Sequence, residues 1–367
     1  MSTVENPGSA AGAGPEATST RVVDVDVHEG YTSVRDLVPY LPDKWKKFIT
    51  EYRWNGPPNP LPYGVPSPGG GTRMDWVPPE GTPMGSDIDA LRRQLFDGEG
   101  VSVAILNGDF RISTLQGWYE FAVAAASAYN DWQIAHWLEP EPRLRGSIHV
   151  VAHDPASAAR EIDRLGGHPQ IAQVFLPAVN DREYGDPRYR PIFEAAVRNN
   201  LPVTLHHSGF TRTAIGYPRY FMEWHVAAIP QTMMCQMASL ICNGVFDALP
   251  TLKVVMLETG ITWIPHFMWR MDLHYRELRS EIPWVKRLPS EILRESLAVG
   301  TQPIEDLTKA EFMQLLDQMG TDRMLMFATD YPHWDADSPT RGLPPGVPDE
   351  IRHNILSGNA DRVFSLT

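Results

Sequence analysis

The feature that most constrains the fold is the alternation of short apolar runs with amphipathic stretches along most of the 367-residue chain. The apolar runs have the composition of strands that helices cover on both faces. They comprise Val22–Val27, Val101–Leu106, Gly146–Val151, Ile171–Leu176, Pro202–His206, Lys253–Leu257, Leu297–Gly300 and Met324–Thr329. Helical patterns between them cover Asp87–Asp97, Ser113–Trp137, Pro155–Leu165, Pro191–Asn199, Ile264–Arg279 and Lys309–Met319. This order predicts an α/β fold, a single (β/α)8 TIM barrel, with an open doubly wound sheet as the alternative.

One segment, residues 51–86, interrupts the alternation after the first strand. It contains nine prolines and seven glycines, which exclude long regular elements. Because the loops that follow barrel strands build active sites, we interpret this segment as a lid-like insertion. Residues 1–20 contain no Lys, no Arg and no apolar run, so we expect a disordered tail and no signal peptide. The predicted organisation is therefore a tail over residues 1–20 and one barrel over residues 21–367.

Charge and cysteine content limit the class of protein. The net charge is −13, from 45 acidic and 32 basic residues, which argues against nucleic acid or an anionic membrane surface as a partner. No run of about 18 apolar residues is present, so no membrane-spanning helix is expected. The two cysteines, Cys235 and Cys242, are too few for a disulfide framework and fit a cytoplasmic location. We therefore expect a small-molecule substrate as the partner.

Polar side chains stand at the carboxyl ends of several predicted strands. The first strand ends in Asp26-Val27-His28, and the period of two places Asp26 and His28 on one face. The fifth, sixth and eighth strands end in or are followed by His206, His207, Glu258, Asp330 and His333. Carboxylates and imidazoles are ligands for Zn and Mn. Because the ends of parallel strands meet at one mouth of a barrel, the sequence predicts a divalent metal site there.

These motifs resemble the amidohydrolase superfamily. The pattern D-x-H at Asp26 and His28, L-P-V-x-x-H ending at His206 and T-D-Y-P-H over residues 329–333 is closest to its amidohydrolase-related branch, which includes the aminocarboxymuconate-semialdehyde decarboxylase-like proteins. G-N-A-D-R-V-F over residues 358–364 resembles the ending of that branch, and the match covers roughly residues 21–366.

The resemblance implies a TIM barrel with Asp26, His28, His206 and Asp330 as ligands of one divalent metal ion. Zn is the first expectation and Mn the alternative. Asp330 would also move a proton, as a carboxylate beside a metal-activated water can. Strand four offers Gln173 and no Lys that could bridge two metals, which favours a single ion. Relatives are often dimers, so the resemblance also points to a homodimer.

The chain departs from the decarboxylase relatives after strand six. Those relatives carry a histidine there that acts as acid and base, where this chain has Glu258. Glu258 could replace that histidine, support the ligands or be a further ligand. His225, in an apolar helical context, is a packing residue or an acid/base group. His207 follows the expected ligand directly, so on a strand it would point the other way and act structurally or support the site.

The loops after strands five and eight supply the remaining candidates. His333 and Trp334 follow Asp330 and are predicted to line the substrate pocket. Arg212 and Arg219 could hold a substrate carboxylate, with solvated surface as the alternative.

Three functions are compatible with these residues. The first expectation is hydrolysis of a C–N or C–O bond in a small organic substrate by a metal-activated water, with Asp330, Glu258 and His225 as catalytic candidates. The alternative is metal-dependent, non-oxidative decarboxylation of an aromatic or unsaturated carboxylic acid. The second alternative is a metal-binding barrel that has lost catalysis.

Overall fold

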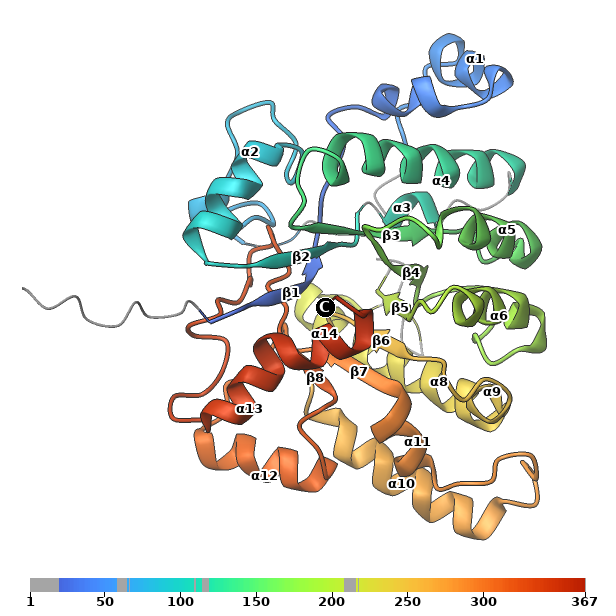
Figure 1. Ribbon diagram of the computed structural model, residues 1–367, viewed down its shortest axis with the longest axis vertical. Helices are drawn as coiled ribbons and strands as arrows, with labels where there is room; N and C mark the ends of the chain where they lie inside the picture. Colours follow the sequence, from blue (N-terminus) through green and yellow to red (C-terminus); the bar gives the residue numbers. More distant parts are fainter. Residues whose placement is uncertain are drawn as a thin grey trace, which may run out of the picture.

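Eight parallel strands form the centre of the molecule (Figure 1). The structure, a computed structural model, describes residues 20–57, 65, 67–108, 110–113, 119–207, 216 and 218–366. Each strand pairs with the next in chain order. The strands are β1 (Val23–Val27), β2 (Val103–Leu106), β3 (Leu144–His149), β4 (Ile171–Pro177), β5 (Val203–His206), β6 (Val254–Met256), β7 (Leu297–Gly300) and β8 (Leu325–Met326). All eight predicted strands are confirmed, with small differences at their ends.

Backbone hydrogen bonds join the first strand to the last and close the barrel. The amide of Val25 donates to the carbonyl of Phe327 at 3.1 Å, and the amide of Asp330 donates to the carbonyl of Asp26 at 3.0 Å. Val27 also forms a parallel bridge with Tyr331. The TIM barrel is therefore confirmed, and the open-sheet alternative is wrong. Closure leaves no sheet edge exposed.

Helices surround the ring of strands (Figure 1). They are α1 (Asp43–Glu51), α2 (Ile88–Leu91), α3 (Phe110–Ser113), α4 (Tyr119–Gln133), α5 (Pro155–Leu165), α6 (Arg190–Arg198), α7 (Phe221–Glu223), α8 (Ile229–Cys242), α9 (Val245–Ala248), α10 (Trp263–Leu278), α11 (Pro289–Ser296), α12 (Lys309–Met319), α13 (Asp349–His353) and α14 (Asn359–Phe364). Shorter 3-10 and π turns are η1 (Val34–Tyr40), η2 (Met74–Trp76), η3 (Arg92–Gly98), η4 (Ile134–Leu138), η5 (Pro187–Tyr189), η6 (Trp224–Ala228) and η7 (Asn354–Gly358).

Local sequence sets where the best-predicted helices begin. Asp154 caps α5 by accepting from the amide of Ser157 at 3.0 Å, and Pro155 occupies the first turn. Thr308 and Glu311 form a capping box at the start of α12. Both helices have the predicted bounds, because their start signals lie within a few residues of one another in the chain.

Apolar side chains fill much of the barrel interior. Side chains from six strands and from α14 form one buried cluster there, which includes Val23, Val25, Val103, Ala172, Val255, Leu257, Ala298, Met326, Val363 and Phe364. Helix α14 thus plugs one end of the barrel with Val363 and Phe364. A second, larger apolar cluster lies between the strands and the outer helices. The buried polar residues that the sequence singles out lie toward the carboxyl ends, the usual place for a TIM-barrel active site.

Part of the insertion over residues 51–86 packs against the loop after β8. Thr72 pairs with His333 in an antiparallel bridge, and the amide of Arg73 donates to the carbonyl of Pro332 at 3.0 Å. The buried Trp76 ring lies 4.8 Å from the ring of Tyr331. Residues 58–64 and 66 lie outside the described part, and so does the predicted tail up to residue 19. A lid role for the insertion stays a prediction.

Trp76→Ala is expected to lower the free energy of unfolding by about 3 kcal/mol, because it opens a cavity beside Tyr331 in a packed contact. Trp76 is only 5% exposed, whereas Trp269 on α10 is 55% exposed. The matched control Trp269→Ala should therefore cost less than about 1 kcal/mol. Denaturant unfolding of both variants measures the difference. Equal losses would show that the insertion adds no packing to the barrel.

No helix in the described part of the chain combines the length and the apolar character needed to span a bilayer.

Candidate metal centre

Four side chains from three strand ends meet at the carboxyl end of the barrel. They are Asp26 and His28 from β1, His206 from β5 and Asp330 after β8, and one ligand atom of each lies within 4.8 Å of the others. The Nε2 atom of His28 is 3.3 Å from Asp26 Oδ1 and 3.1 Å from Asp330 Oδ1. The Nε2 atom of His206 is 3.7 Å from Asp26 Oδ2. The structure therefore brings together all four residues that the sequence predicts as ligands.

Hydrogen bonds from the surrounding chain aim these side chains at one point. The Nδ1 atom of His28 is 3.3 Å from the carbonyl oxygen of Gly108, and Nδ1 of His206 donates to the carbonyl of His207 at 2.8 Å. Because a carbonyl only accepts, each Nδ1 carries the proton and each Nε2 presents its lone pair to the centre. The side-chain amide of Asn107 donates to Asp26 Oδ1 at 2.7 Å, which directs Asp26 Oδ2 toward the same point.

The atoms that face the centre fit a divalent cation. Asp26 Oδ2, His28 Nε2 and Asp330 Oδ2 are buried and have no hydrogen-bond partner among the described residues. Leaving such atoms unsatisfied costs about 1–3 kcal/mol each, more when they are charged. Two imidazole nitrogens and two carboxylates form a donor set suited to Zn or Mn. The residues present therefore fit one divalent metal ion.

The charges of the cluster also suit a cation. Burial lowers the pKa of His206 to about 4, which leaves it in the neutral form that ligates. Burial opposes the charge of Asp26, but His206 and His28 outweigh it and hold the pKa of Asp26 below its ordinary value. Burial likewise lowers the pKa of His28, yet Asp26 outweighs it and, with Asp330, raises that pKa well above its ordinary value. A metal ion would replace the proton on His28, so metal affinity should rise with pH.

Backbone strain accompanies two of the polar strand ends. Asp330 has φ of 61° and Glu258 has φ of 53°, a left-handed conformation that residues other than glycine rarely adopt. At Asp330 the turn is held by its own amide, which donates to the carbonyl of Asp26 at 3.0 Å. Such strain persists where the surrounding structure overdetermines the backbone, which is common at functional sites.

Glu258 links the metal cluster to further histidines. Its Oε2 contacts Nε2 of His207 and lies 3.4 Å from Nε2 of His206, while its Oε1 lies 3.5 Å from Nε2 of His225. The same Nε2 of His225 is 3.8 Å from Oδ2 of Asp335. We call His207, Glu258, His225 and Asp335 the acid–imidazole chain. In it, carboxylates and imidazoles alternate from the side of the metal cluster outward.

The charges of the acid–imidazole chain favour a proton donor. Burial opposes the charge of Glu258, but His207 and His225 outweigh it and hold the pKa of Glu258 well below its ordinary value. Burial lowers the pKa of His225, yet Glu258 and Asp335 outweigh it and raise the pKa above 6.5. The carboxylate of Glu258 therefore makes His225 hold its proton more tightly than a free imidazole does.

His207 requires a correction. Strand alternation predicts that it points away from the face of His206, but its imidazole contacts Glu258, which itself lies beside His206. The reason is that β5 ends at His206, so the period of two no longer applies to the next residue. The reading of His207 as a supporting residue of the site fits this position.

Three of the remaining candidates, His333, Trp334 and Arg219, lie in the described part of the chain. The Nδ1 atom of His333 is 2.6 Å from Asp330 Oδ1, and Trp334 is partly exposed. Arg219 is exposed, with its guanidinium 5.0 Å from the ring centre of Tyr220. Arg212 lies outside the described residues.

Sequence reasoning missed Asp335 and Asn107. Asp335 stands in the loop after β8, where burial raises its pKa to about 7, helped by the nearby Asp330 and Glu258 carboxylates. Asn107 directly follows the apolar run of β2, so it carries the signal that revealed the other strand ends. It also accepts from Nε2 of Gln173 at 2.6 Å, and Gln173 accepts from the hydroxyl of Thr204. Gln173 is thus part of a polar network behind Asp26.

Asn107→Ala is expected to weaken metal binding by about 10–100-fold, because Asp26 loses the donor that fixes its orientation. The measurement is the dissociation constant for Mn by calorimetry. The matched control is Asn243→Ala on the exposed end of α8, where the amide bonds only to Ser239. An unchanged dissociation constant in Asn107→Ala would contradict the orienting role.

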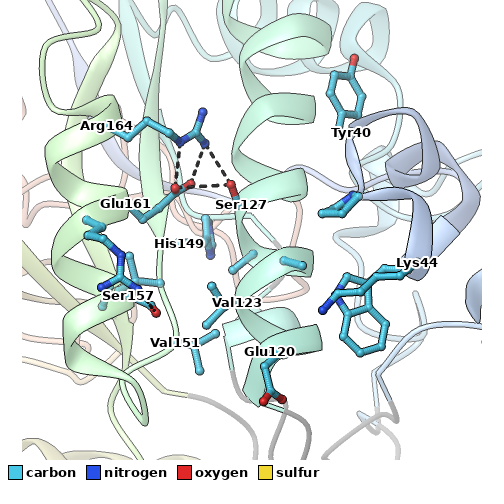
Figure 2. Close-up of a pocket in the computed structure, with 17 residues that line it drawn as sticks. Tyr40, Lys44, Glu120, Val123, Ser127, His149, Val151, Ser157, Glu161 and Arg164 are labelled. Carbon is cyan, nitrogen blue, oxygen red and sulfur yellow. Dashed lines mark hydrogen bonds and ion pairs between the residues drawn. The ribbon is translucent and has the colours of Figure 1, made fainter.

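A separate hollow of about 460 Å³ lies outside the barrel, among η1, α1, α4, α5 and the end of β3 (Figure 2). At one end Arg164 donates to Glu161 at 2.8 Å and to the hydroxyl of Ser127 at 3.2 Å. These polar groups already pair with one another, and none of the four clustered ligands lines the hollow. This hollow is therefore separate from the candidate metal centre.

Comparison with known proteins decides the family. A sequence model of the amidohydrolase family (Amidohydro_2) matches residues 23–366. The chain belongs to the amidohydrolase family. This confirms the resemblance drawn from the D-x-H and T-D-Y-P-H motifs. No curated protein matches the chain.

Solved structures share the fold of this amidohydrolase family member. A 5-carboxyvanillate decarboxylase from Sphingomonas paucimobilis is 22% identical with a TM-score of 0.66, and the match covers 95% of this chain and 100% of that chain. A 5-carboxyvanillate decarboxylase from Novosphingobium aromaticivorans, complexed with manganese and 4-hydroxy-3-methoxy-5-nitrobenzoic acid, is 18% identical with a TM-score of 0.70 and coverages of 95% and 97%. An amidohydrolase from Mycobacterium avium subsp. paratuberculosis is 20% identical with a TM-score of 0.73 and coverages of 96% and 99%.

Proposed function

We propose that this amidohydrolase family member is a metal-dependent, non-oxidative decarboxylase of an aromatic or unsaturated carboxylic acid. The observation that carries the proposal is the position of His225, whose Nε2 lies 3.5 Å from Glu258 Oε1 beside the metal cluster, a contact that raises the pKa of His225. Decarboxylation needs a proton donor for carbon, whereas hydrolysis by a metal-activated water needs a base first. Two of the fold relatives are decarboxylases, one of them with manganese bound, which supports this alternative over the hydrolase expectation.

Asp26, His28, His206 and Asp330 would hold the metal ion. When bound, the ion supplies a fixed positive charge that positions an anionic substrate and stabilises developing negative charge. Glu258 keeps His225 protonated and oriented, with Asp335 on the other side of the same nitrogen. As the bond between the carboxylate and its carbon breaks, the electron pair stays on that carbon and takes a proton from the His225 imidazolium. The products are CO2 and the substrate with hydrogen in place of its carboxylate; His225 is left neutral, and solvent returns a proton to it.

Purified protein, loaded with Mn or with Zn, should release CO2 from at least one hydroxybenzoate or unsaturated acid in a substrate panel. In D2O the product should carry deuterium at the carbon that lost CO2, because the proton comes from a group that exchanges with solvent. The same protein should leave amides and lactones intact. Hydrolysis without CO2 release would restore the hydrolase expectation. Turnover of neither class, with tight binding of a small ligand, would support a barrel that has lost catalysis.

A further inference from the structure

An apolar pocket of about 260 Å³ opens beside the acid–imidazole chain. Its walls come from three parts of the chain that are distant in sequence: the insertion, the α7–η6 segment and the loop after β8. The residues that the argument uses are Val65, Phe221, Met222, His225, Val226 and Trp334. Ser67 completes the described part of the wall, and within that part His225 is the one side chain that can carry a charge.

His225 is shared between this pocket and the reaction centre. Its ring stacks on Phe221 at 5.6 Å with an interplanar angle of 17°, and lies 6.4 Å from the ring of Trp334. Its Nε2 faces Glu258, which lies beside His206 of the metal cluster. A substrate whose carboxylate is held at the metal cluster therefore has the apolar pocket as its neighbour on the far side of His225.

Large apolar side chains stand exposed around this pocket. Met222 is 74% exposed, Val226 is 69% exposed, and Trp334 is also open to solvent. Exposed apolar groups that cluster around a hollow mark a surface that gains free energy when a ligand covers it. Phe221 and Trp334 lie edge to face at 6.3 Å, so the pocket offers both an aromatic face and an aromatic edge.

We propose that this apolar pocket binds an uncharged, aryl-sized hydrophobic substituent of the substrate, opposite the carboxylate that reacts. The proposal rests on the proposed function, and it narrows the substrate class to carboxylic acids that carry such a substituent. A cavity of about 150 Å³ holds one benzene ring, so the pocket has room for a phenyl group and a few further carbons. Among the described lining residues there is no carboxylate to pair with a cationic substituent, and the one ionisable side chain, His225, already faces Glu258. A simple hydroxybenzoate leaves the pocket unfilled.

Calorimetry with Mn-loaded protein tests the proposal through a matched pair of probes, 4-phenylbenzoate and benzoate. The second ring adds six carbon atoms, and we expect about 20-fold tighter binding of 4-phenylbenzoate. The ratio of the two dissociation constants should fall toward one in Val226→Asp, which places a carboxylate in the wall, and in Trp334→Ala, which removes an aromatic surface. The control Val77→Asp, at an exposed apolar residue outside the pocket, should keep the ratio.

The possible outcomes distinguish failure of the pocket assignment from failure of the decarboxylase proposal. A ratio near one in the unaltered protein, or a ratio that both pocket variants preserve, would overturn the pocket assignment. CO2 release from plain hydroxybenzoates with no gain from a phenyl substituent would also overturn it, while leaving the decarboxylase proposal standing. A 20-fold ratio in a protein that releases no CO2 from any acid would support the pocket and count against the reaction.

Discussion

Replacement of both Asp26 and His28 by alanine is expected to abolish binding of the proposed metal ion and to lower the rate of the proposed decarboxylation by at least about 10³-fold. The two residues supply half of the clustered ligand atoms, and His28 alone approaches both Asp26 and Asp330 within 3.3 Å. Elemental analysis of protein purified without chelator should find about one equivalent of Zn or Mn in the unaltered protein. The double variant should contain almost none.

The matched control for this experiment removes an exposed carboxylate and an exposed imidazole. Asp43 begins α1 with a fully open side chain, and His274 is exposed on α10, so Asp43→Ala with His274→Ala should keep the metal. Both double variants should keep the circular dichroism of the barrel, because the apolar cluster at the other end of the strands is unchanged. Metal retained in the double variant of Asp26 and His28 would contradict the assignment of these residues as ligands.

His225→Phe is expected to lower kcat by about 10²–10⁴-fold while the metal content stays at that of the unaltered protein. A phenyl ring can keep the stacking on Phe221 but carries no proton, so the change isolates acid catalysis. His266→Phe, at an exposed histidine on α10, is the matched control. An unaltered kcat in His225→Phe would remove His225 from the mechanism.

The pH profile gives a second readout for the same residue. Burial lowers the pKa of His225, but Glu258 and Asp335 raise it above its ordinary 6.5. A donor must be protonated to act, so kcat should be highest below this pKa and should fall as pH rises through it. Glu258→Gln removes the largest source of the increase and should move this alkaline limb to lower pH. A limb at the same pH in both proteins would show that His225 is not the titrating donor.

The sequence allows three roles for Glu258, and its contacts in the structure favour one of them. The sequence left it as a replacement for a catalytic histidine, a support for the ligands or a further ligand. Its Oε2 contacts His207, and its Oε1 faces His225, whereas the four-residue cluster forms without it. We therefore propose that Glu258 positions and charges His225.

Much of this protein could be predicted because its informative residues lie on a strand or within a few residues of a strand's carboxyl end. The period of two places Asp26 and His28 on one face, and parallel pairing brings the ends of β1, β5 and β8 to one mouth. These are local rules, and they need only the strand assignment. The same rule extended to Asn107 at the end of β2 would have found the residue that orients Asp26. The donor chemistry alone does not point to Asn107, because an amide side chain is not one of the usual ligands of Zn or Mn.

Residues whose position depends on how a connection folds could not be placed by strand periodicity. His207 follows the last residue of β5, His225 lies on η6, and Asp335 lies in a loop, so no period fixes where their side chains point. Their meeting at Glu258 depends on how each connection packs against the others. The apolar pocket has the same origin, because its walls come from the insertion, from η6 and from the loop after β8.

The sequence by itself therefore determined the barrel, since strand periodicity is a property of short stretches of chain, and its motifs implied the four candidate ligands through their resemblance to the amidohydrolase superfamily. Only the tertiary structure decided that α14 plugs the opposite end, that His225 lies against Glu258, and that an apolar pocket adjoins it. These features arise from contacts between segments more than 30 residues apart, such as His225 with Glu258. Such contacts are set by the packing of the whole barrel, and no local pattern encodes them.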